Sequence, residues 1–430
     1  MDNVAIGYLG LGIGLLMLLL GVPVAFGLGA VGLIGIAAIV GVPQALSQAG
    51  LVFFHEGTNL VLVAVPLFIL MGNLANHTGI ASGLFRAMAD TLGRLPGGLA
   101  IASVFGSAGF SAIAGSSTAT VVTMGRIIVP ELKKYNYDRR LGAGTLAAAG
   151  TLGILIPPSL VLIFYGIMTE NSIAALFIAG IMPGLLTVIV FALVIWLGAM
   201  ARPNLAPPIP GPGLRDTLRS LRGTLPIFGL FAVIIGGIYF GIFTPTEAAG
   251  IAVTGVVLYG LVARTLTWRA ARAALLDTVV VSGMIFAIVF TGYFLSRFIA
   301  ITGLTDSLIQ VIVAMELGSY EFILVITVMY LLLGCAMDVL AMILLTVPFV
   351  YPIIIHLGFD PIWFGIYIVI MAEIAMITPP LGLNLFVMRA IAPDTSFAQI
   401  CVGAIPFVIA ELVITALITV YPQIVLWMVP

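Results

Sequence analysis

Long apolar stretches without a charged residue recur along this chain and restrict the folds open to it. Between Asp2 and Glu56 there is no Asp, Glu, Lys or Arg. Stretches of about 20 apolar residues are long enough to cross the hydrocarbon core of a bilayer. The whole chain is 62% hydrophobic and 8% charged, so a soluble fold would lack polar surface to cover its core. The segments of about ten residues with alternating polarity that a β-barrel needs are missing. We therefore predict an all-α polytopic membrane protein.

The apolar pattern also predicts where the helices lie. We expect loops at residues 41–58 and 301–321, an amphipathic interfacial helix at 79–96 and a hydrophilic linker at 202–222. The predicted spanning helices cover residues 4–20, 24–40, 60–77, 173–200, 224–243, 246–263, 278–300 and 400–427.

One apolar stretch, about 98–128, is interrupted by Gly115-Ser116-Ser117. The loops on both sides of it are basic, and Lys and Arg favour the cytoplasmic side of a membrane. A single crossing would separate these loops, so we predict a re-entrant hairpin with Gly115–Ser117 at its tip. The next span, 141–168, should be broken at Pro157-Pro158, because proline provides no backbone N–H.

The same features return further along the chain. A second hairpin is predicted over about 322–355, with Gly334–Asp338 at its tip, and a second broken helix over 361–390 at Pro379-Pro380. The loop before this hairpin is acidic. Four pairs of landmarks are separated by 222 residues: Pro23 and Pro245, Pro130 and Pro352, Asp138 and Asp360, and Pro157 and Pro379.

These landmarks predict an inverted repeat, because five full crossings separate the two copies. We divide the chain into an N-terminal helix (1–22), a first repeat (23–200), a linker with a connecting helix (201–244) and a second repeat (245–430). Counting crossings from the basic loops places both termini outside the cytoplasm. Broken helices at matching positions of two repeats point to an ion and substrate site near the bilayer midplane.

Several residues in these segments allow more than one interpretation. Gly115–Ser117 suits an ion site, a close helix contact or a serine cap. Asp338 is a candidate cation ligand, proton carrier or helix cap. Arg297 is either an interfacial side chain or a contact for a substrate carboxylate. Glu373 is either functional or a buried hydrogen-bonded acid, and Glu411 is expected to be interfacial or structural.

Other functions lack the residues that they need. There is no GxxxxGK[ST] phosphate loop and no nucleophile–base constellation, so we expect neither an ATPase nor another enzyme. The histidines and the two cysteines lack metal spacing, so we expect no transition metal and no cofactor. No basic run suggests nucleic acid. An ion gradient is the remaining source of energy.

Several motifs together resemble the large membrane subunit of tripartite ATP-independent periplasmic (TRAP) transporters. They are GFSAIAGSSTATVVTMGRIIVPELKKYNYD at 109–138, PTEAAG at 245–250, MDVLAMILLTVPFVYPII at 337–354, FDPIWFG at 359–365 and ITPPLGLNLFV at 377–387. The resemblance implies an elevator-type transporter in a bacterial cytoplasmic membrane, driven by Na⁺ and importing an organic anion. It also implies a small four-helix membrane subunit, which we expect as a separate chain, and a periplasmic substrate-binding protein. A standalone Na⁺/carboxylate symporter of related inverted-repeat design is the alternative.

The resemblance places one ion site at the first tip with the helix before Pro157, and another at the second tip with the helix around Pro379. Candidate Na⁺-binding residues are Gly115, Ser116, Ser117, Thr151, Gly153, Pro157, Gly334, Asp338, Thr378, Pro379 and Gly382. Candidate substrate-binding residues are Thr118, Ser159, Asn384 and Arg297.

Overall fold

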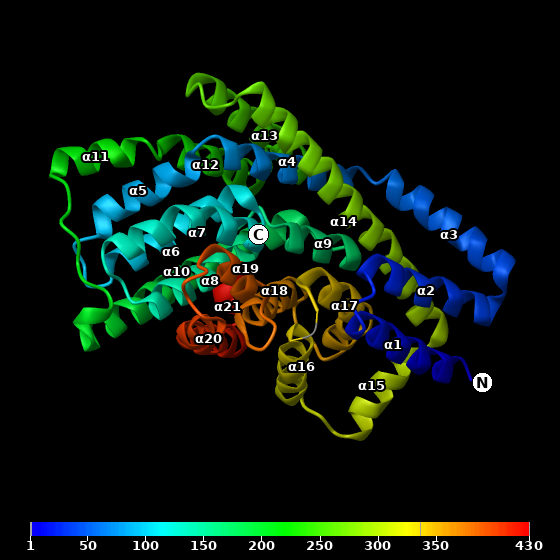
Figure 1. Ribbon diagram of the computed structural model, residues 1–430. Helices are drawn as coiled ribbons and strands as arrows, with labels where there is room; N and C mark the ends of the chain where they lie inside the picture. Colours follow the sequence, from blue (N-terminus) through cyan, green and yellow to red (C-terminus); the bar gives the residue numbers. More distant parts are fainter. Residues whose placement is uncertain (1, 336, 430) are drawn as a thin grey trace.

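The computed structural model describes residues 2–335 and 337–429, and all regular elements in this part of the chain are helices (Figure 1). Ala336, inside the predicted second tip, lies outside the described residues, as do Met1 and Pro430. The helices are α1 (Asn3–Leu19), α2 (Val24–Val40), α3 (Val42–Gly57), η1 (Leu60–Val63), α4 (Ala64–His77), α5 (Ile80–Leu92), α6 (Gly98–Ala114), α7 (Ser117–Lys134), α8 (Arg139–Leu155), α9 (Leu160–Thr169), α10 (Ile173–Ala201), η2 (Pro203–Leu205), α11 (Leu214–Arg222), α12 (Leu225–Tyr239), α13 (Pro245–Val262), α14 (Trp268–Thr302), α15 (Leu304–Ala314), α16 (Ser319–Gly334), α17 (Val339–His356), α18 (Pro361–Ile377), α19 (Leu383–Ile391), α20 (Phe397–Val420) and α21 (Gln423–Leu426).

Many of these helices suit a bilayer. Among the described residues, seven helical stretches are long and apolar enough to cross a membrane, and six shorter apolar helices accompany them. One of the seven stretches, Arg139–Thr169, contains both α8 and α9. The prediction of an all-α polytopic membrane protein is confirmed.

Two predicted loops are wrong, because both contain helices. Residues 41–58 form α3, which begins after a turn at Gly41 (φ +91°) and has a proline in its first turn. Residues 301–321 contain α15. Both helices are short and mix polar with apolar residues, so neither has the continuous apolar run by which we assigned spans.

The linker at 202–222 is also more ordered than its composition indicates, since α11 (9 residues) forms its end and packs on α5. The Ser220 hydroxyl donates a hydrogen bond to the Asp90 carboxylate. Arg94 donates to the carbonyl oxygens of Gly211 and Pro212. These contacts hold the segment against the amphipathic helix α5, which is the helix expected at 79–96.

The ends of the helices follow the 222-residue offset. α7 and α17 begin and end 222 residues apart, and so do α8 and α18. Asp138 and Asp360 cap α8 and α18 in the same way, since each carboxylate accepts hydrogen bonds from two backbone N–H groups. The offset therefore relates local structure as well as sequence. The inverted orientation and the domain limits stay predictions.

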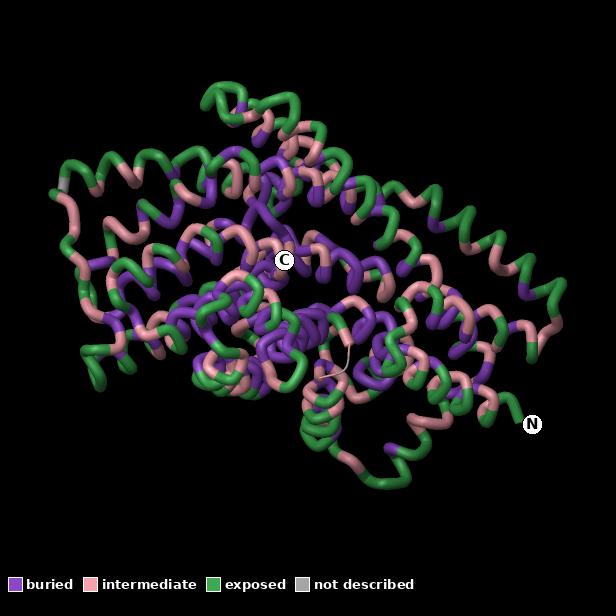
Figure 2. Tube along the Cα trace, viewed as in Figure 1, coloured by how far each residue is buried: buried purple, intermediate pink, exposed green. Residues whose placement is uncertain are grey.

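The most deeply buried helices are α8 and α18, which lie side by side near the centre (Figure 2). All residues from Gly142 to Leu155 and from Ile362 to Ile377 are buried. The N-terminal helices lie at the periphery and expose large apolar side chains such as Leu16, Phe26 and Phe54. A helix with an exposed apolar face suits lipid rather than water.

Candidate functional site

The first interruption is a tight turn between α6 and α7. Gly115 has φ +60°, a conformation that favours glycine. A Cβ atom at this position would also lie 3.0 Å from the carbonyl oxygen of Pro158. Ser116 caps α7, because its hydroxyl accepts a long hydrogen bond (3.5 Å) from the backbone N–H of Ala119. This turn therefore contains both a serine cap and a close backbone contact. Both are compatible with an ion site at the same place.

The end of α8 packs against this turn. α8 ends at Leu155 and α9 begins at Leu160, with a cis Pro157-Pro158 bond between them. A Cβ atom on Gly153 would lie 2.6 Å from the Ser116 carbonyl oxygen, so the two backbones are in direct contact. Because Pro157 has no N–H, it cannot donate the usual helical hydrogen bond to the carbonyl of Gly153.

Two hydroxyl groups near this end point back into the helix. Thr151 is fully buried, and its hydroxyl donates to the Ala148 carbonyl oxygen at 2.7 Å. Ser159 donates to the Ile154 carbonyl oxygen at 2.5 Å and replaces the donor that Pro158 lacks. A hydroxyl that donates in this way keeps its lone pairs for a cation or another donor. Ser159 uses its lone pair to cap α9 through the Leu162 N–H, so it serves the backbone rather than the cavity.

The second interruption repeats this arrangement. Gly334 ends α16 and packs on α18, where its Cβ atom would lie 2.9 Å from the Cα atom of Ala375. Asp338 caps α17 by accepting from the Ala341 N–H at 2.8 Å. The cis Pro379-Pro380 bond separates α18 from α19.

Beyond this bond, backbone oxygen atoms converge on Gly382. The carbonyl oxygens of Met376 and Thr378 would each lie 3.0 Å from a Cβ atom at position 382. The Thr378 hydroxyl donates to the Ile374 carbonyl oxygen at 2.6 Å, as the Thr151 hydroxyl does in α8.

Both interruptions border one cavity of about 500 Å³. Asp338 comes from the second interruption, and the candidates from the first are Gly115, Ser116, Ser117 and Thr118. A larger groove of about 750 Å³ lies between α12 and α13, but apolar residues form most of its wall. The smaller cavity therefore has the polar groups that a charged ligand needs.

Asn384 connects the two halves of the chain. It lies on α19, is fully buried, and its amide donates to the Ser117 hydroxyl at 2.8 Å and to the Ala147 carbonyl oxygen at 3.0 Å. It does not line the cavity. Asn384 therefore contacts the first tip from the side away from the cavity and positions Ser117.

We expect Asn384→Ala to lower the free energy of unfolding by about 1–3 kcal/mol, because two buried groups lose their donor. The measurement is the midpoint of thermal unfolding of the purified protein. Asn204→Ala, at an exposed position in η2, should leave this midpoint unchanged. An equal shift in both variants would contradict the role assigned to Asn384.

Arg297 lies elsewhere. Its Nε atom donates to the side-chain oxygen of Gln48 on α3, at 3.2 Å, and Arg297 is not among the residues that line the cavity. The structure thus does not bring it together with the other candidates.

Three polar residues of the cavity wall were not predicted. Asn73 donates to the Thr278 hydroxyl at 3.0 Å, and the Thr123 hydroxyl donates to the Asn76 side-chain oxygen at 2.9 Å. Asn73, Asn76 and Thr123 all line the cavity. The signal was present in the sequence, since two amides three residues apart inside an apolar span lie on one helix face.

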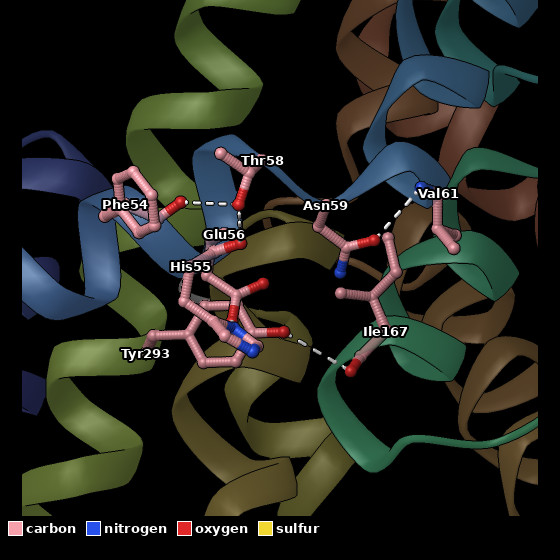
Figure 3. Close-up of polar contacts among 8 residues, drawn as sticks. All are labelled: Phe54, His55, Glu56, Thr58, Asn59, Val61, Ile167 and Tyr293. Carbon is pink, nitrogen blue, oxygen red and sulfur yellow. Dashed lines mark hydrogen bonds and ion pairs between the residues drawn. The ribbon is translucent and has the colours of Figure 1, made fainter.

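A second polar cluster joins the end of α3 to α9 and α14 (Figure 3). Glu56 is buried, and one of its carboxylate oxygens lies 3.0 Å from the ring of His55. The Tyr293 hydroxyl donates to the Ile167 carbonyl oxygen at 3.4 Å. Because 41–58 was expected to be a loop, we had no reason to place these residues together.

An ion pair ties the end of α7 to the segment between α19 and α20. The Lys133 ammonium lies 2.5 Å from Asp394, and Arg139 donates to the Asp394 backbone carbonyl at 3.0 Å. The hydrogen bond and the charge of Lys133 lower the pKa of the Asp394 carboxyl. The two halves of the chain therefore also meet at their basic end.

Comparison with known proteins agrees with this architecture. Residues 11–424 match the family described as "Tripartite ATP-independent periplasmic transporter, DctM component". The C4-dicarboxylate TRAP transporter large permease protein DctM of Pseudomonas aeruginosa is 35% identical over 383 residues, which are 89% of each chain. The sialic acid TRAP transporter large permease protein SiaM of Vibrio cholerae is 31% identical over 370 residues, 85% of each chain.

A solved structure supports the fold independently. The YdaH transporter of Alcanivorax borkumensis superposes with a TM-score of 0.62 over 91% of each chain at 17% identity. This likeness supports the helical fold alone. The match over nearly the whole chain and the identity with curated permeases settle the family: this chain belongs to the DctM family, the large permease subunits of TRAP transporters.

Proposed function

We propose that this multi-pass inner-membrane protein imports an organic anion of the carboxylate type, together with Na⁺. The observation that carries the proposal is the cavity of about 500 Å³ bordered by both interruptions. Its wall combines hydroxyl groups, two amides and the carboxylate of Asp338. The relatives described above are named for C4-dicarboxylate and sialic acid, both of which carry carboxylates.

The proposal includes two Na⁺ sites, one at each interruption. The first comprises Gly115–Ser117 with Thr151 and Gly153, and the second comprises Gly334 and Asp338 with Thr378 and Gly382. Na⁺ binds oxygen atoms, and helices interrupted by proline provide carbonyl oxygens without helical partners. The backbone contacts of Gly153 with Ser116 and of Gly334 with Ala375 support this assignment.

The partners and the movement are part of the proposal. A small four-helix membrane subunit would hold the outer helices, and a periplasmic binding protein would deliver the substrate. The two hairpins, α6–α7 and α16–α17, would be re-entrant and move with α8, α9, α18 and α19 as one elevator domain. Both termini would face the periplasm.

Uptake of radiolabelled C4-dicarboxylate or sialic acid into proteoliposomes tests this function. The full complex needs the large subunit, the small subunit and the binding protein. We expect uptake to require an inward Na⁺ gradient and to fall to background when either the gradient or the binding protein is omitted.

Two controls separate this proposal from the alternative. Liposomes containing only the small subunit should show background uptake. Na⁺-driven uptake by the large subunit alone would identify a standalone Na⁺/carboxylate symporter. Uptake that is indifferent to Na⁺ would contradict both functions.

A further inference from the structure

Three buried polar side chains lie outside both proposed Na⁺ sites. Thr187 of α10, Glu373 of α18 and Glu411 of α20 are each 0% exposed. Within the described residues, the Thr187 hydroxyl and all four carboxyl oxygens have no hydrogen-bond partner. Buried polar atoms are nearly always paired in native proteins, so five unpaired oxygens need an explanation. Glu411 is therefore not an interfacial residue.

The packing of α10 on α20 brings Thr187 to Glu411. The rings of Phe191 and Phe407 pack edge to face, with centroids 5.0 Å apart. Thr187 lies four residues before Phe191, and Glu411 lies four residues after Phe407. Residues four apart share a helix face, so both polar side chains lie on the faces that meet.

The two helices run in opposite directions. The start of α10 and the end of α20 both lie beside the start of α18. A Cβ atom on Gly365 would lie 2.7 Å from the Leu176 side chain of α10. The Trp363 indole donates to the Ile418 carbonyl oxygen of α20 at 2.8 Å. Thr187 and Glu411 therefore each lie one helical turn from the Phe191–Phe407 pair, both on the side toward the start of α18.

The same two contacts orient Glu373. It lies ten residues after Trp363, which faces α20, and eight residues after Gly365, which faces α10. At about 100° per residue, Glu373 falls on the face between these two contacts. Glu373 lies about 15 Å from Trp363 along the α18 axis, and Glu411 lies about 10 Å from Ile418 along the α20 axis. All three polar side chains thus converge within about one helical turn.

No basic side chain compensates these two acids within the described part of the chain. The helices packed on α18 or α20 are α8, α9, α10, α16, α17, α19 and α21. Their charged residues lie in terminal turns or caps: Arg139, Arg140, Asp138, Glu170, Arg202, Glu321, Asp338, His356, Asp360 and Arg389. Their other titratable groups are Tyr165, Tyr320, Tyr330, Cys335, Tyr351, Tyr367, Cys401 and Tyr421.

Two carboxylates side by side in an apolar core cannot both stay ionised. A proton between them replaces one charge by a hydrogen bond and needs no additional space. We propose that Glu373 and Glu411 form a proton-binding site beside the buried Thr187 hydroxyl. One carboxylate oxygen takes H⁺ from hydronium and leaves water, and the same O–H bond breaks when the proton returns to water.

The position of the site connects it to transport. Glu373 lies 222 residues after Thr151, so it occupies in α18 the place of a candidate Na⁺ residue in α8. α18 also forms the wall of the second proposed Na⁺ site. We infer that the proton enters and leaves during the transport cycle; this step rests on the proposed function, whereas proton binding itself does not.

Infrared titration of the purified full chain tests proton binding without transport. The wild-type protein should show a carbonyl stretch of a protonated carboxyl group that disappears as the pH rises and shifts in D₂O. The variant carrying both Glu373→Gln and Glu411→Gln should remove this signal, whereas each single variant should shift its midpoint, because the remaining buried carboxyl still favours the neutral form. Glu321→Gln, at an exposed position of α16, should retain it. A wild-type signal that is missing, or that never changes with pH, would overturn the proposal.

A second experiment uses proteoliposomes of the complex containing a pH-sensitive dye. Uptake should acidify the lumen, and the double glutamine variant should abolish this acidification while still binding ²²Na⁺. Loss of ²²Na⁺ binding would assign the cluster to Na⁺ and refute the proton site. Thr187→Val keeps both carboxyl groups, so it should shift the midpoint of the infrared titration rather than remove the signal. The wild-type titration remains decisive where a variant does not fold.

Discussion

Replacing Gly153 by alanine should reduce Na⁺-driven uptake at least about fivefold. The added Cβ atom would stand 2.6 Å from the Ser116 carbonyl oxygen and 2.7 Å from its carbon. Both atoms belong to the backbone, so no side-chain rotation relieves the clash. Overpacking of this kind costs about 1–3 kcal/mol, and each 1.4 kcal/mol changes an equilibrium about tenfold. The first tip must therefore move away from α8 and carry its oxygen atoms out of the proposed Na⁺ site.

The measurement is the initial rate of uptake by the complete complex as a function of Na⁺ concentration. Gly198→Ala is the matched control, because this glycine lies in α10 and a Cβ atom there meets nothing within 4 Å. In that position alanine favours the helix by about 1 kcal/mol, so uptake should not decrease. Wild-type Na⁺ dependence in Gly153→Ala would remove the end of α8 from the ion site.

Features that depend on local rules could be predicted from the sequence. Two adjacent prolines remove two successive backbone donors, and α8 and α18 end shortly before Pro157-Pro158 and Pro379-Pro380. An aspartate at a helix start accepts from the free N–H groups, so the equal spacing of Asp138 and Asp360 corresponds to equal helix starts. Such rules need no knowledge of the surrounding structure.

Contacts between distant segments could not be predicted in this way. Asn384 was assigned to substrate, but its partners are Ser117 and the backbone of α8, more than 230 residues away in sequence. Glu411 was expected to be interfacial or structural, and only the packing of α10, α18 and α20 places it next to Glu373. A single sequence shows which residue types are present, but it does not show which helix faces pack against one another.

The helices α3 and α15 were missed for a related reason. A span was recognised by a continuous apolar run, whereas these two helices interleave polar and apolar residues. Gln48 shows the consequence, since its contact with Arg297 depends on α3 being a helix. The interfacial role offered for Arg297 is consistent with this contact at the periphery.

Asp338→Asn should weaken Na⁺ activation of uptake about 10- to 100-fold while leaving the stability of the protein unchanged. Asparagine caps helices about as well as aspartate, so the hydrogen bond to the Ala341 N–H remains possible. Only the negative charge that borders the cavity is lost. Interactions with a charged group are worth about 1.5–3 kcal/mol, which gives this range at 1.4 kcal/mol per tenfold change.

Two measurements separate the cap from the charge: the Na⁺ concentration for half-maximal uptake and the midpoint of thermal unfolding. Asp360→Asn is the matched control, because Asp360 caps α18 through two N–H groups and does not border the cavity. It should change neither value. If Asp338→Asn behaves in the same way, Asp338 is a cap alone. The second Na⁺ site must then consist of backbone carbonyls and hydroxyls, as the arrangement around Gly153 requires for the first.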